Sequence, residues 1–514
     1  MVDCGPRKAF WVPVLVVVLV LAIVPAVVLR ARAPSSQKPI VQWMDTTTDR
    51  GDRLPDFSFC GYRASEQPPP NGTQPAVRLD AKKGDQTRRI QDALDETAVA
   101  GGGVVALGEG DFIVSAKGLT IPSGVILRGA GVGLTQLKLS ELGRRPAISF
   151  GNGTEIESVL PFHTTNIIDQ YVPIGSSQVT VNDTISLHHG DRVFVQRQVT
   201  EQWVRANGMA DLFRNGDRQT WLEVDTVVRQ PREIKRIDGN NVTLDVPLTD
   251  ALDTTQNYTS PVLVAFRPPL TSSEMGLEHL SLKLSPTCSG VSLNTHCDNP
   301  AISFSPWTTN SWARNLEIAG FNFFITVEYN ASRITLSDIV MTRDADATTH
   351  DNTDRGLPAD VLIEGTQVLI QDCAQRGLKT ARSFAVMTGS LVPGPNAVLR
   401  HRTESDDQMI VPHQRWAHGL LVEDTNVTVR LFNRETNGTG HGWAINAGVG
   451  WNLKGTVIVQ SPPLGVNWCV GCSGLVDERS NGSFVEQGQE VLPTSLFETQ
   501  LKDRTGRLLS DTSR

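Results

Sequence analysis

Aromatic and basic side chains are concentrated in one part of the chain, between Asp406 and Trp468. This segment is about an eighth of the sequence, yet it contains four of the ten tryptophans and three of the ten histidines. A bound sugar ring needs an aromatic plane for its C–H face and hydrogen-bonding side chains for its hydroxyls. The composition of the segment therefore predicts a carbohydrate-binding site.

Three residues of this segment have the types that acid–base chemistry on a sugar needs: His413, Arg415 and His441. Both histidines stand beside Pro or Gly in loop-like sequence, and imidazole is a frequent general base. An arginine can neutralise a substrate carboxylate. We interpret these three as catalytic, and we expect substrate contacts from five further residues of the segment: Asp406, Asp407, Trp443, Asn467 and Trp468.

Structural roles are open for several residues of the same segment. Trp416 and Trp451 have apolar neighbours, which favours packing over sugar binding. His418 begins a predicted strand and fits a hydrogen-bonded structural histidine. Arg415 can equally form an ion pair with Asp406 or Asp407.

The spacing of these residues points to a repeating scaffold. His441 follows His413 by 28 residues, and Trp468 follows Trp443 by 25. Solenoid repeats are roughly 20–45 residues long, so each interval is close to one coil. Because equivalent residues of successive coils stack on one face, these side chains are predicted to line one groove.

Short β-rich runs occur between Val104 and Leu139, separated by Gly, Pro and Ser. Each run is too short for a helix and can bury its apolar side chains only against the next coil of the same kind. The preceding segment, Gly84 to Gly103, predicts an amphipathic helix whose apolar face holds Ile90, Ala93, Leu94 and Thr97. A helix over the open end of a solenoid is the cap that such a fold requires.

The sequence GDQT-x2-IQ-x2-LD, followed by GGGVVALGEGDFIV and LTIPSGVILRGAG, resembles the N-terminal signature of the pectate-lyase-like superfamily. The resemblance is strong over residues 75–140 and continues beyond them only as a strand rhythm. It implies an all-β, right-handed, single-stranded parallel β-helix with an N-terminal capping helix. Because the superfamily contains lyases, hydrolases and epimerases, the resemblance does not identify the reaction.

Three functions fit this resemblance. Basic candidates favour a polysaccharide lyase that cleaves an acidic, uronate-containing polymer by β-elimination. Asp406-Asp407 and Gly440-His441-Gly442 partly match polygalacturonase-like or rhamnogalacturonase-like hydrolases, but no Arg-x-Lys follows and no convincing Asn-x-Asp precedes them. The third alternative is a β-helix that binds carbohydrate without cleaving it. We expect a monomer with a polysaccharide partner.

The rhythm of the coils sets the predicted organisation. Residues 33–74 are a lead-in segment, 75–504 form the β-helix domain, and 505–514 are a tail. The rhythm breaks at about 180–251, where we predict an inserted β element that forms a wall beside the substrate. Ser495 to Arg504 reads as a closing helix.

The N-terminus indicates the secretory pathway. Residues 1–32 contain an uncharged run, Ala9 to Leu29, that is long enough for a signal anchor, and Ala-Arg-Ala before Pro34 leaves a cleaved signal peptide as the alternative. We therefore expect a secreted protein, or one held in the membrane by this segment with its catalytic domain outside. Nine Asn-x-Ser/Thr sequons agree: Asn71, Asn152, Asn182, Asn241, Asn257, Asn330, Asn426, Asn437 and Asn481.

The cysteines also suit an oxidising compartment. Cys288 and Cys297 predict a local disulfide, as do Cys469 and Cys472, for which a redox or zinc role is the alternative. Cys60 and Cys373 remain, either paired or free.

Charge and acidic motifs limit the other partners. The net charge of −8 gives no basic surface for nucleic acid. No cofactor is required by the sequence. Ca²⁺ is left open, because the loop from Arg343 to Gly356 offers Asp344, Asp346, Asp351 and Asp354, although a solvated acidic loop is the simpler interpretation.

Overall fold

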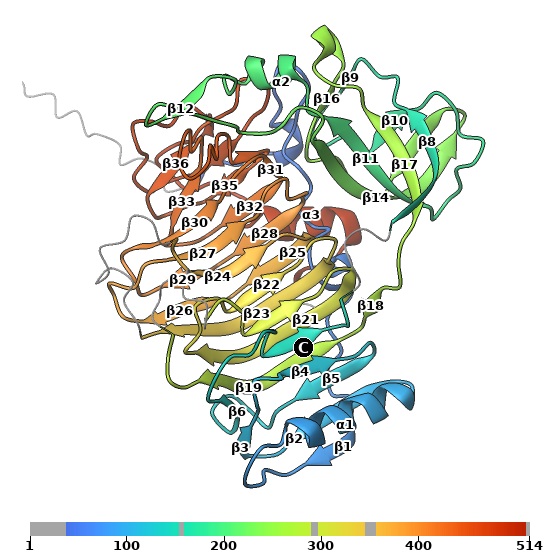
Figure 1. Cartoon of the computed structure of the whole chain (residues 1–514). Coiled ribbons are helices and arrows are strands. Elements are labelled where there is room, and N and C mark those ends of the chain that lie inside the picture. Colours follow the sequence, from blue (N-terminus) through green and yellow to red (C-terminus); the bar gives the residue numbers. More distant parts are fainter. Residues whose placement is uncertain (1–37, 154–158, 289–296, 345–355, 510–514) are drawn as a thin grey trace, which may run out of the picture. The chain divides into compact units, whose positions relative to one another are not determined.

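The computed structural model describes residues 38–153, 159–288, 297–344 and 356–509. Residues from Lys38 onward form one compact unit, and most of its strands are parallel, as in the predicted β-helix (Figure 1). The predicted membrane segment, Ala9 to Leu29, lies outside the described residues. Within the described ranges, no helix has the length and apolar character needed to cross a membrane.

One wall of the solenoid is a nine-stranded parallel sheet in the described part of the chain. Its members are β4 (Leu119–Ile121), β7 (Ile148–Phe150), β20 (Ile302–Phe304), β22 (Ile325–Val327), β24 (Ala359–Ile363), β27 (Ser383–Thr388), β30 (Gln408–Pro412), β33 (Thr428–Leu431) and β36 (Val457–Val459). Strands β20 to β36 follow one another at one strand per coil, so their carboxyl ends form a single edge.

The rest of the wall is a 17-stranded sheet that bends. It consists of β1 (Pro75–Leu79), β2 (Gly103–Leu107), β3 (Gly110–Ile113), β5 (Val125–Arg128), β6 (Thr135–Leu139), β18 (Ser272–Ser273), β19 (Gly276–Leu284), β21 (Thr308–Ala319), β23 (Ser332–Arg343), β25 (Thr366–Gln371), β26 (Ala374–Gly377), β28 (Asn396–Leu399), β29 (Arg402–Thr403), β32 (Leu420–Glu423), β35 (Val449–Trp451), β37 (Trp468–Val470) and β38 (Ser483–Val485). The long strands β19, β21 and β23 turn at His279, Asn315 and Asp338, each with a positive φ. Asn and Asp tolerate this left-handed conformation better than most residues.

The core is a set of apolar columns inside the coils. Alternate residues of each strand point inward, and in the nine-stranded sheet Ile325 stands in register with Val361, which stands in register with Val386. All three are at most 1% exposed. Each such side chain contributes roughly 1.5–3 kcal/mol by leaving water, but only if the neighbouring coil is present to cover it.

Helix α1 (Thr87–Val99) packs on β1, β2, β4 and β5 at one end of the solenoid (Figure 1). Its buried face includes Ile90, Ala93, Leu94 and Thr97, the four residues that the sequence places together. Asp85 accepts a hydrogen bond from the Thr87 amide at 2.8 Å and so satisfies one free N–H of the first turn.

The inserted element is longer than its predicted range of about 180–251. A six-stranded antiparallel sheet is formed by β8 (Leu160–Asn166), β10 (Gln178–Thr180), β11 (Arg192–Gln198), β14 (Val227–Asp238), β15 (Asn241–Leu244) and β17 (Val262–Arg267). It has its own core, and its outermost strands in sequence, β8 and β17, pair with each other. Both are short β-rich runs like those of the coils, so rhythm alone did not separate them from the solenoid.

Three smaller strand pairs and one short helix complete the inserted element and the coils beside it. They are β9 (Tyr171–Val172) with β16 (Leu252–Asp253), β12 (Leu212–Arg214) with β13 (Asp217–Gln219), β31 (Ala417–His418) with β34 (Ile445–Asn446), and helix α2 (Glu201–Ala206). The pair β31–β34 is parallel and belongs to two successive coils.

The lead-in segment runs along the outside of the bent sheet. Phe57 donates its amide proton to Gln500 of the closing helix, α3 (Leu496–Thr505). Tyr62 donates its amide proton to the Thr335 hydroxyl of β23, and Pro70 accepts from Arg314 of β21. The lead-in therefore fastens α3 to several coils.

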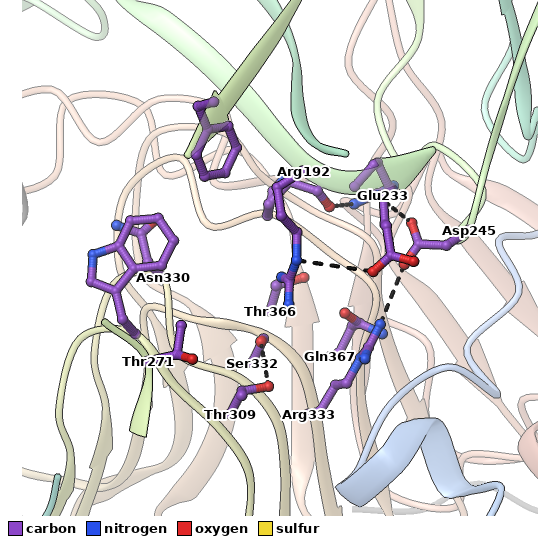
Figure 2. A pocket seen from close by; sticks show the side chains of 14 residues that line it. Arg192, Glu233, Asp245, Thr271, Thr309, Asn330, Ser332, Arg333, Thr366 and Gln367 are labelled. Atoms are coloured by element: carbon purple, nitrogen blue, oxygen red, sulfur yellow. Dashed lines mark hydrogen bonds and ion pairs between the residues drawn. The ribbon is translucent and has the colours of Figure 1, made fainter. Parts of the chain in front are cut away.

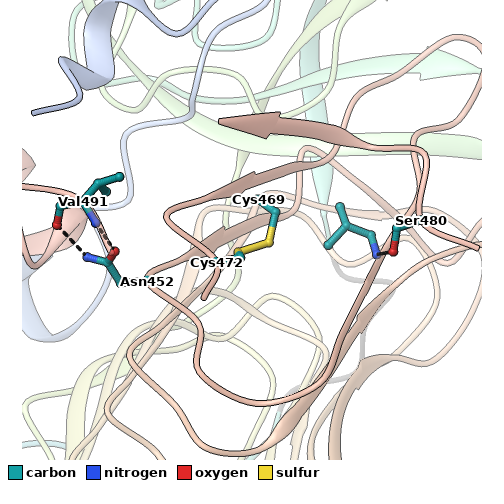
Figure 3. The surroundings of a disulfide bond; sticks show 6 residues. Asn452, Cys469, Cys472, Ser480 and Val491 are labelled. Atoms are coloured by element: carbon teal, nitrogen blue, oxygen red, sulfur yellow. Dashed lines mark hydrogen bonds between the residues drawn. A yellow bond between two sulfur atoms is a disulfide. The ribbon is translucent and has the colours of Figure 1, made fainter. Parts of the chain in front are cut away.

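Both predicted disulfides are present, Cys288–Cys297 and Cys469–Cys472. Cys469 lies in β37 and Cys472 follows its end (Figure 3), and both are fully buried, so their side chains are closed to a redox partner. Cys60 and Cys373 are free and buried in different apolar clusters. The structure thus decides between the two alternatives for this pair in favour of free thiols.

Candidate active site

A row of side chains follows the carboxyl ends of β22, β24, β27 and β30. Val327, Ile363, Thr388 and Pro412 are in register across these strands. The ladder continues one residue further, because the amides of Glu364, Gly389 and His413 bond to the carbonyls of Val327, Ile363 and Thr388 at 2.8, 2.9 and 3.3 Å. Glu328, Glu364, Gly389 and His413 therefore occupy one row, with about 4.8 Å between neighbouring coils.

Two acidic side chains of this row are in contact. The Glu364 carboxyl is hydrogen-bonded to the carboxyl of Glu328 and to the Tyr329 hydroxyl. Glu328 also accepts a hydrogen bond from the Ser303 hydroxyl at 3.0 Å. Burial, then the like charge of Glu328, raises the pKa of Glu364 to about 7. Glu364 can therefore hold or release a proton near neutral pH, as a general acid must.

Gly389 provides the space that the acidic pair uses. A Cβ at this position would lie 3.0 Å from Glu364 Oε1 and 3.5 Å from the Tyr329 hydroxyl. The Glu364 carboxyl and the Tyr329 hydroxyl thus both lie beside Gly389 of the next coil, and a side chain at position 389 would crowd them. The sequence analysis missed Glu328, Tyr329 and Glu364, although the repeated pattern of an apolar strand followed by Glu, in ITVE and VLIE, marks two of them.

Two histidines of successive coils meet beyond the acidic pair. The rings of His413 and His441 are 4.7 Å apart between centroids, with an interplanar angle of 74°. Arg415 and Trp416 donate their amide protons to the carbonyls of His441 and Trp443, which ties the two coils together. The structure therefore brings all three predicted catalytic residues, His413, Arg415 and His441, close together.

Both rings are neutral at ordinary pH. Burial, followed by the positive charges of Arg434 and Arg415, lowers the pKa of His413 to about 4. Burial, followed by His413 and the same arginines, lowers the pKa of His441 to about 3. His441 Nδ1 is buried and has no hydrogen-bond partner.

The arginines around these rings have no carboxylate partner among the described residues. Arg415 donates to the carbonyls of Trp221 and Thr439 and to the side chains of Gln414 and Thr439. Arg434 donates to the His413 carbonyl at 2.7 Å. Burial, then the charge of Arg430, lowers the pKa of Arg434 to about 10. This part of the row is cationic and lacks a counter-ion, so it suits an anionic group of a substrate.

The predicted tryptophan platforms are buried. Trp443 is 7% exposed, and its indole N–H donates to the Asn207 carbonyl of the inserted element at 3.0 Å. Trp468 is 1% exposed in an apolar cluster that also contains Trp451 and residues of α3. A sugar platform needs an open ring face, so neither ring can serve a substrate without moving.

The three polar residues predicted to contact substrate are not available at the histidine pair. Asn467 is bonded to the backbone, and Asp406 and Asp407 lie at the other end of their strand. Asn467 is fully buried, and its amide bonds to the backbone of Gly448, Ile445 and Gln460. Asp406 and Asp407 are exposed at the start of β30, whereas His413 follows its end. Asp407 and Asp406 precede His413 by six and seven residues, so at about 3.3 Å per residue they lie roughly 20–23 Å from it along the strand.

The structure also shows the surroundings of Trp416, His418 and part of the loop considered for Ca²⁺. Trp416 is 1% exposed and donates its indole N–H to Asp250 of the inserted element at 2.9 Å, and His418 contacts the Thr249 hydroxyl at 2.7 Å. Both residues are therefore structural. The loop considered for Ca²⁺ has only Asp344 of its four aspartates among the described residues. In the described ranges, no three His, Cys, Asp or Glu side chains are grouped as metal ligands.

Comparison with known proteins gives similarity of fold only. No family model and no curated protein match the sequence. A mutant tailspike protein of E. coli bacteriophage HK620, in complex with a pentasaccharide, is 10% identical over 87% of this chain and 59% of its own, with a TM-score of 0.40. The tailspike of Acinetobacter baumannii bacteriophage AP22, in complex with capsular saccharide, is 13% identical over 77% of this chain and 66% of its own, with a TM-score of 0.36.

The A-module of the Azotobacter vinelandii mannuronan C-5 epimerase AlgE6 is 11% identical over 80% of this chain and 96% of its own, with a TM-score of 0.32. This chain thus spans less than two thirds of each tailspike's length.

Proposed function

We propose that this protein is a secreted or membrane-anchored enzyme that hydrolyses glycosidic bonds of an acidic polysaccharide, with Glu364 as the general acid. The observation that carries the proposal is the buried contact between Glu364 and Glu328, in which burial and then the charge of Glu328 raise the pKa of Glu364 to about 7. Cleavage of a glycosidic bond needs a proton for the leaving oxygen at the pH where the enzyme works. Glu364 keeps that proton where an ordinary glutamate has lost it.

Glu328 is the second carboxyl beside Glu364, and the two must part to admit a substrate, because retaining glycosidases hold their carboxyls about 5–5.5 Å apart and inverting ones about 6.5–9.5 Å apart. Glycosidases use one carboxyl group as acid and another as base or nucleophile. In this chain the two come from successive coils, and the Ser303 hydroxyl holds Glu328 by a hydrogen bond. The sequence favoured elimination because its candidates were basic. The acidic pair favours hydrolysis.

The cationic part of the row supports an acidic substrate. Arg415 and Arg434 surround two neutral histidines without an anionic partner among the described residues. His413 is two coils from Glu364, so a polymer bound along the row would place a carboxylate there about two residues from the bond that is cleaved.

Elimination is the second candidate, and the neutral histidines are the observation that favours it. Removal of the C5 proton of a uronate needs an unprotonated base, and His413 is unprotonated at neutral pH. A pKa of about 4 also makes it a weak base, which is why we place this reaction second. Arg415 would then neutralise the substrate carboxylate.

Incubation with polygalacturonate, alginate and rhamnogalacturonan tests the proposal. Hydrolysis releases reducing ends without ultraviolet absorbance, whereas elimination produces unsaturated uronates that absorb. We expect reducing ends alone. Absorbing products would assign the reaction to elimination, and binding without any product would indicate a carbohydrate-binding protein.

A further inference from the structure

A recess lies between the inserted sheet and the solenoid. Arg192, Glu233 and Asp245 of the inserted element face Arg333, Thr366 and Gln367 of the coils across it (Figure 2). Trp307 and Phe266 also line it, and their ring centroids are 6.1 Å apart. The recess therefore combines aromatic rings with charged and hydroxyl groups, the composition of a sugar-binding site.

The recess begins two residues beyond the acidic pair. Asn330 follows Glu328 by two positions, and Thr366 follows Glu364 by two. Both glutamates come from the same two coils as these lining residues. A glycan held over Glu364 therefore has a neighbouring unit within reach of the recess.

Positive charge exceeds negative charge among the lining residues. Three arginines, Arg192, Arg232 and Arg333, accompany two carboxylates, Glu233 and Asp245. Arg192 and Glu233 are 3.9 Å apart, and Arg333 and Asp245 are 3.3 Å apart. Arg232 is the surplus cation.

Arg232 is 4% exposed, and its guanidinium is held by carbonyl oxygens. It donates to the backbone carbonyls of Pro231 and Pro247 and to the side chain of Gln230. Burial lowers its pKa to about 10. Among the described residues, no carboxylate is in hydrogen-bond contact with the Arg232 guanidinium. An anion in the recess would compensate its positive charge.

Three buried polar atoms of the lining residues lack partners: Trp307 Nε1, Thr366 Oγ1 and Arg232 Nε. An indole N–H and a guanidinium N–H can only donate, and the threonine hydroxyl can also donate. Each of these three atoms can be satisfied by an acceptor. Buried donors without acceptors are costly and are retained where a ligand or water completes them.

The enclosed space is about 40 Å³, which holds only a few water molecules. A pyranose ring is too large for it, but a carboxylate of three heavy atoms is of the right size. We propose that this recess binds the carboxylate of a uronate residue next to the cleaved bond. This inference rests on the proposed function, because it assumes that the same glycan lies over Glu364.

Binding to a variant without cleavage tests this subsite separately from catalysis. Deglycosylated Glu364→Gln protein is titrated by calorimetry with galacturonate and mannuronate tetramers and with their carboxyl-reduced counterparts. The same titrations are then carried out on the double variant that also carries Arg192→Gln. Arg192 is half-exposed and its partner Glu233 keeps Lys235 at 3.0 Å, so folding should persist. Arg229→Gln, in the same sheet but outside the recess, is the matched control.

We expect Arg192→Gln to weaken binding of an acidic tetramer by about tenfold, or about 1.4 kcal/mol, since a charge-assisted hydrogen bond to the carboxylate is lost. The affinity for the carboxyl-reduced tetramers should not change in Arg192→Gln. Arg229→Gln should bind every tetramer as tightly as the protein without it. Trp307→Phe, which keeps the ring and removes the donor, should give a smaller loss for the acidic ligand only. Equal affinity for acidic and reduced tetramers, or an unchanged affinity in Arg192→Gln, would overturn the subsite even if Glu364 proves essential for cleavage.

Discussion

The acidic pair lies on the row that also contains His413, whose ring contacts His441, but burial has opposite consequences for the acidic pair and the histidine pair. For Glu364 and for both histidines, burial and neighbouring charges favour the neutral form. For Glu364 this moves the pKa up to about 7, close to neutral pH. For His413 and His441 it moves the pKa down to about 4 and about 3, away from neutral pH. The same physical cause makes the glutamate a better acid at neutral pH and the histidines weaker bases.

The neighbours of each pair sharpen this difference. Glu328 adds a negative charge beside Glu364, whereas Arg434 and Arg415 add positive charge beside the histidines. The first arrangement retains a proton, and the second attracts an anion. We therefore assign chemistry to the acidic pair and substrate binding to the histidine pair.

The largest expected effect is that of Glu364→Gln. Loss of a general acid typically costs about 10²–10⁴-fold in rate, and glutamine keeps the shape of the side chain without the proton. Initial rates of reducing-end release measure this effect. Glu404→Gln, which removes an exposed carboxylate near Arg376, is the matched control. Cleavage at the wild-type rate in Glu364→Gln would remove the chemical role from the acidic pair.

Glu328→Gln is expected to change the pH dependence of turnover as well as its rate. Without the negative charge of Glu328, the pKa of Glu364 should fall from about 7. Activity that needs protonated Glu364 should then decline at lower pH than in the wild type. The pH profile of kcat/KM measures the shift, and an unmoved alkaline limb would show that Glu328 does not control this proton.

The histidine pair should give a smaller effect. If hydrolysis is the reaction, His413→Asn and His441→Asn should lower kcat by less than about tenfold and raise KM for acidic polymers, since they disturb binding and not proton transfer. Arg415→Lys should also raise KM, because an ammonium group cannot replace the planar guanidinium. A loss of about 10²–10⁴-fold in kcat with either histidine variant would instead make it a base and favour elimination.

Much of the fold could be predicted from local sequence because a solenoid is built from local rules. The run from Val104 to Leu139 repeats short strands and turns, and each coil needs only its neighbour. The 28-residue interval between His413 and His441 was likewise sufficient to place them on successive coils. Both disulfides could be predicted from the sequence for the same reason, since each closes a short loop.

The acidic pair could not be found in the same way. Glu328 and Glu364 are 36 residues apart, whereas His413 and His441 are 28 residues apart, so one regular spacing does not relate the acidic pair. Their contact depends on the register of β22 with β24. Trp468 failed as a sugar platform for the opposite reason. Its sequence neighbours do not reveal that α3, which begins 28 residues later, contributes to the cluster that buries it.

The smallest effect on activity is expected from Glu423→Gln, which tests whether a raised pKa alone marks a catalytic acid. Burial raises the pKa of Glu423 to about 7, as for Glu364, but Glu423 is 1% exposed and accepts hydrogen bonds from the Leu496 and Phe497 amides of α3. It caps a helix and touches no part of the row. Turnover should therefore be unchanged.

Stability should change instead, with a sign set by the pKa of Glu423. Between its ordinary pKa of 4.5 and about 7, the folded protein holds a proton that the unfolded chain has released. The contribution of Glu423 to stability therefore falls as the pH rises through this range. Glutamine cannot ionise, so the melting temperature of Glu423→Gln should decline less than that of the wild type from about pH 5 to about pH 8. Parallel curves for the two proteins would mean that Glu423 is already ionised in the fold, and a loss of turnover would mean that α3 influences the row from a distance.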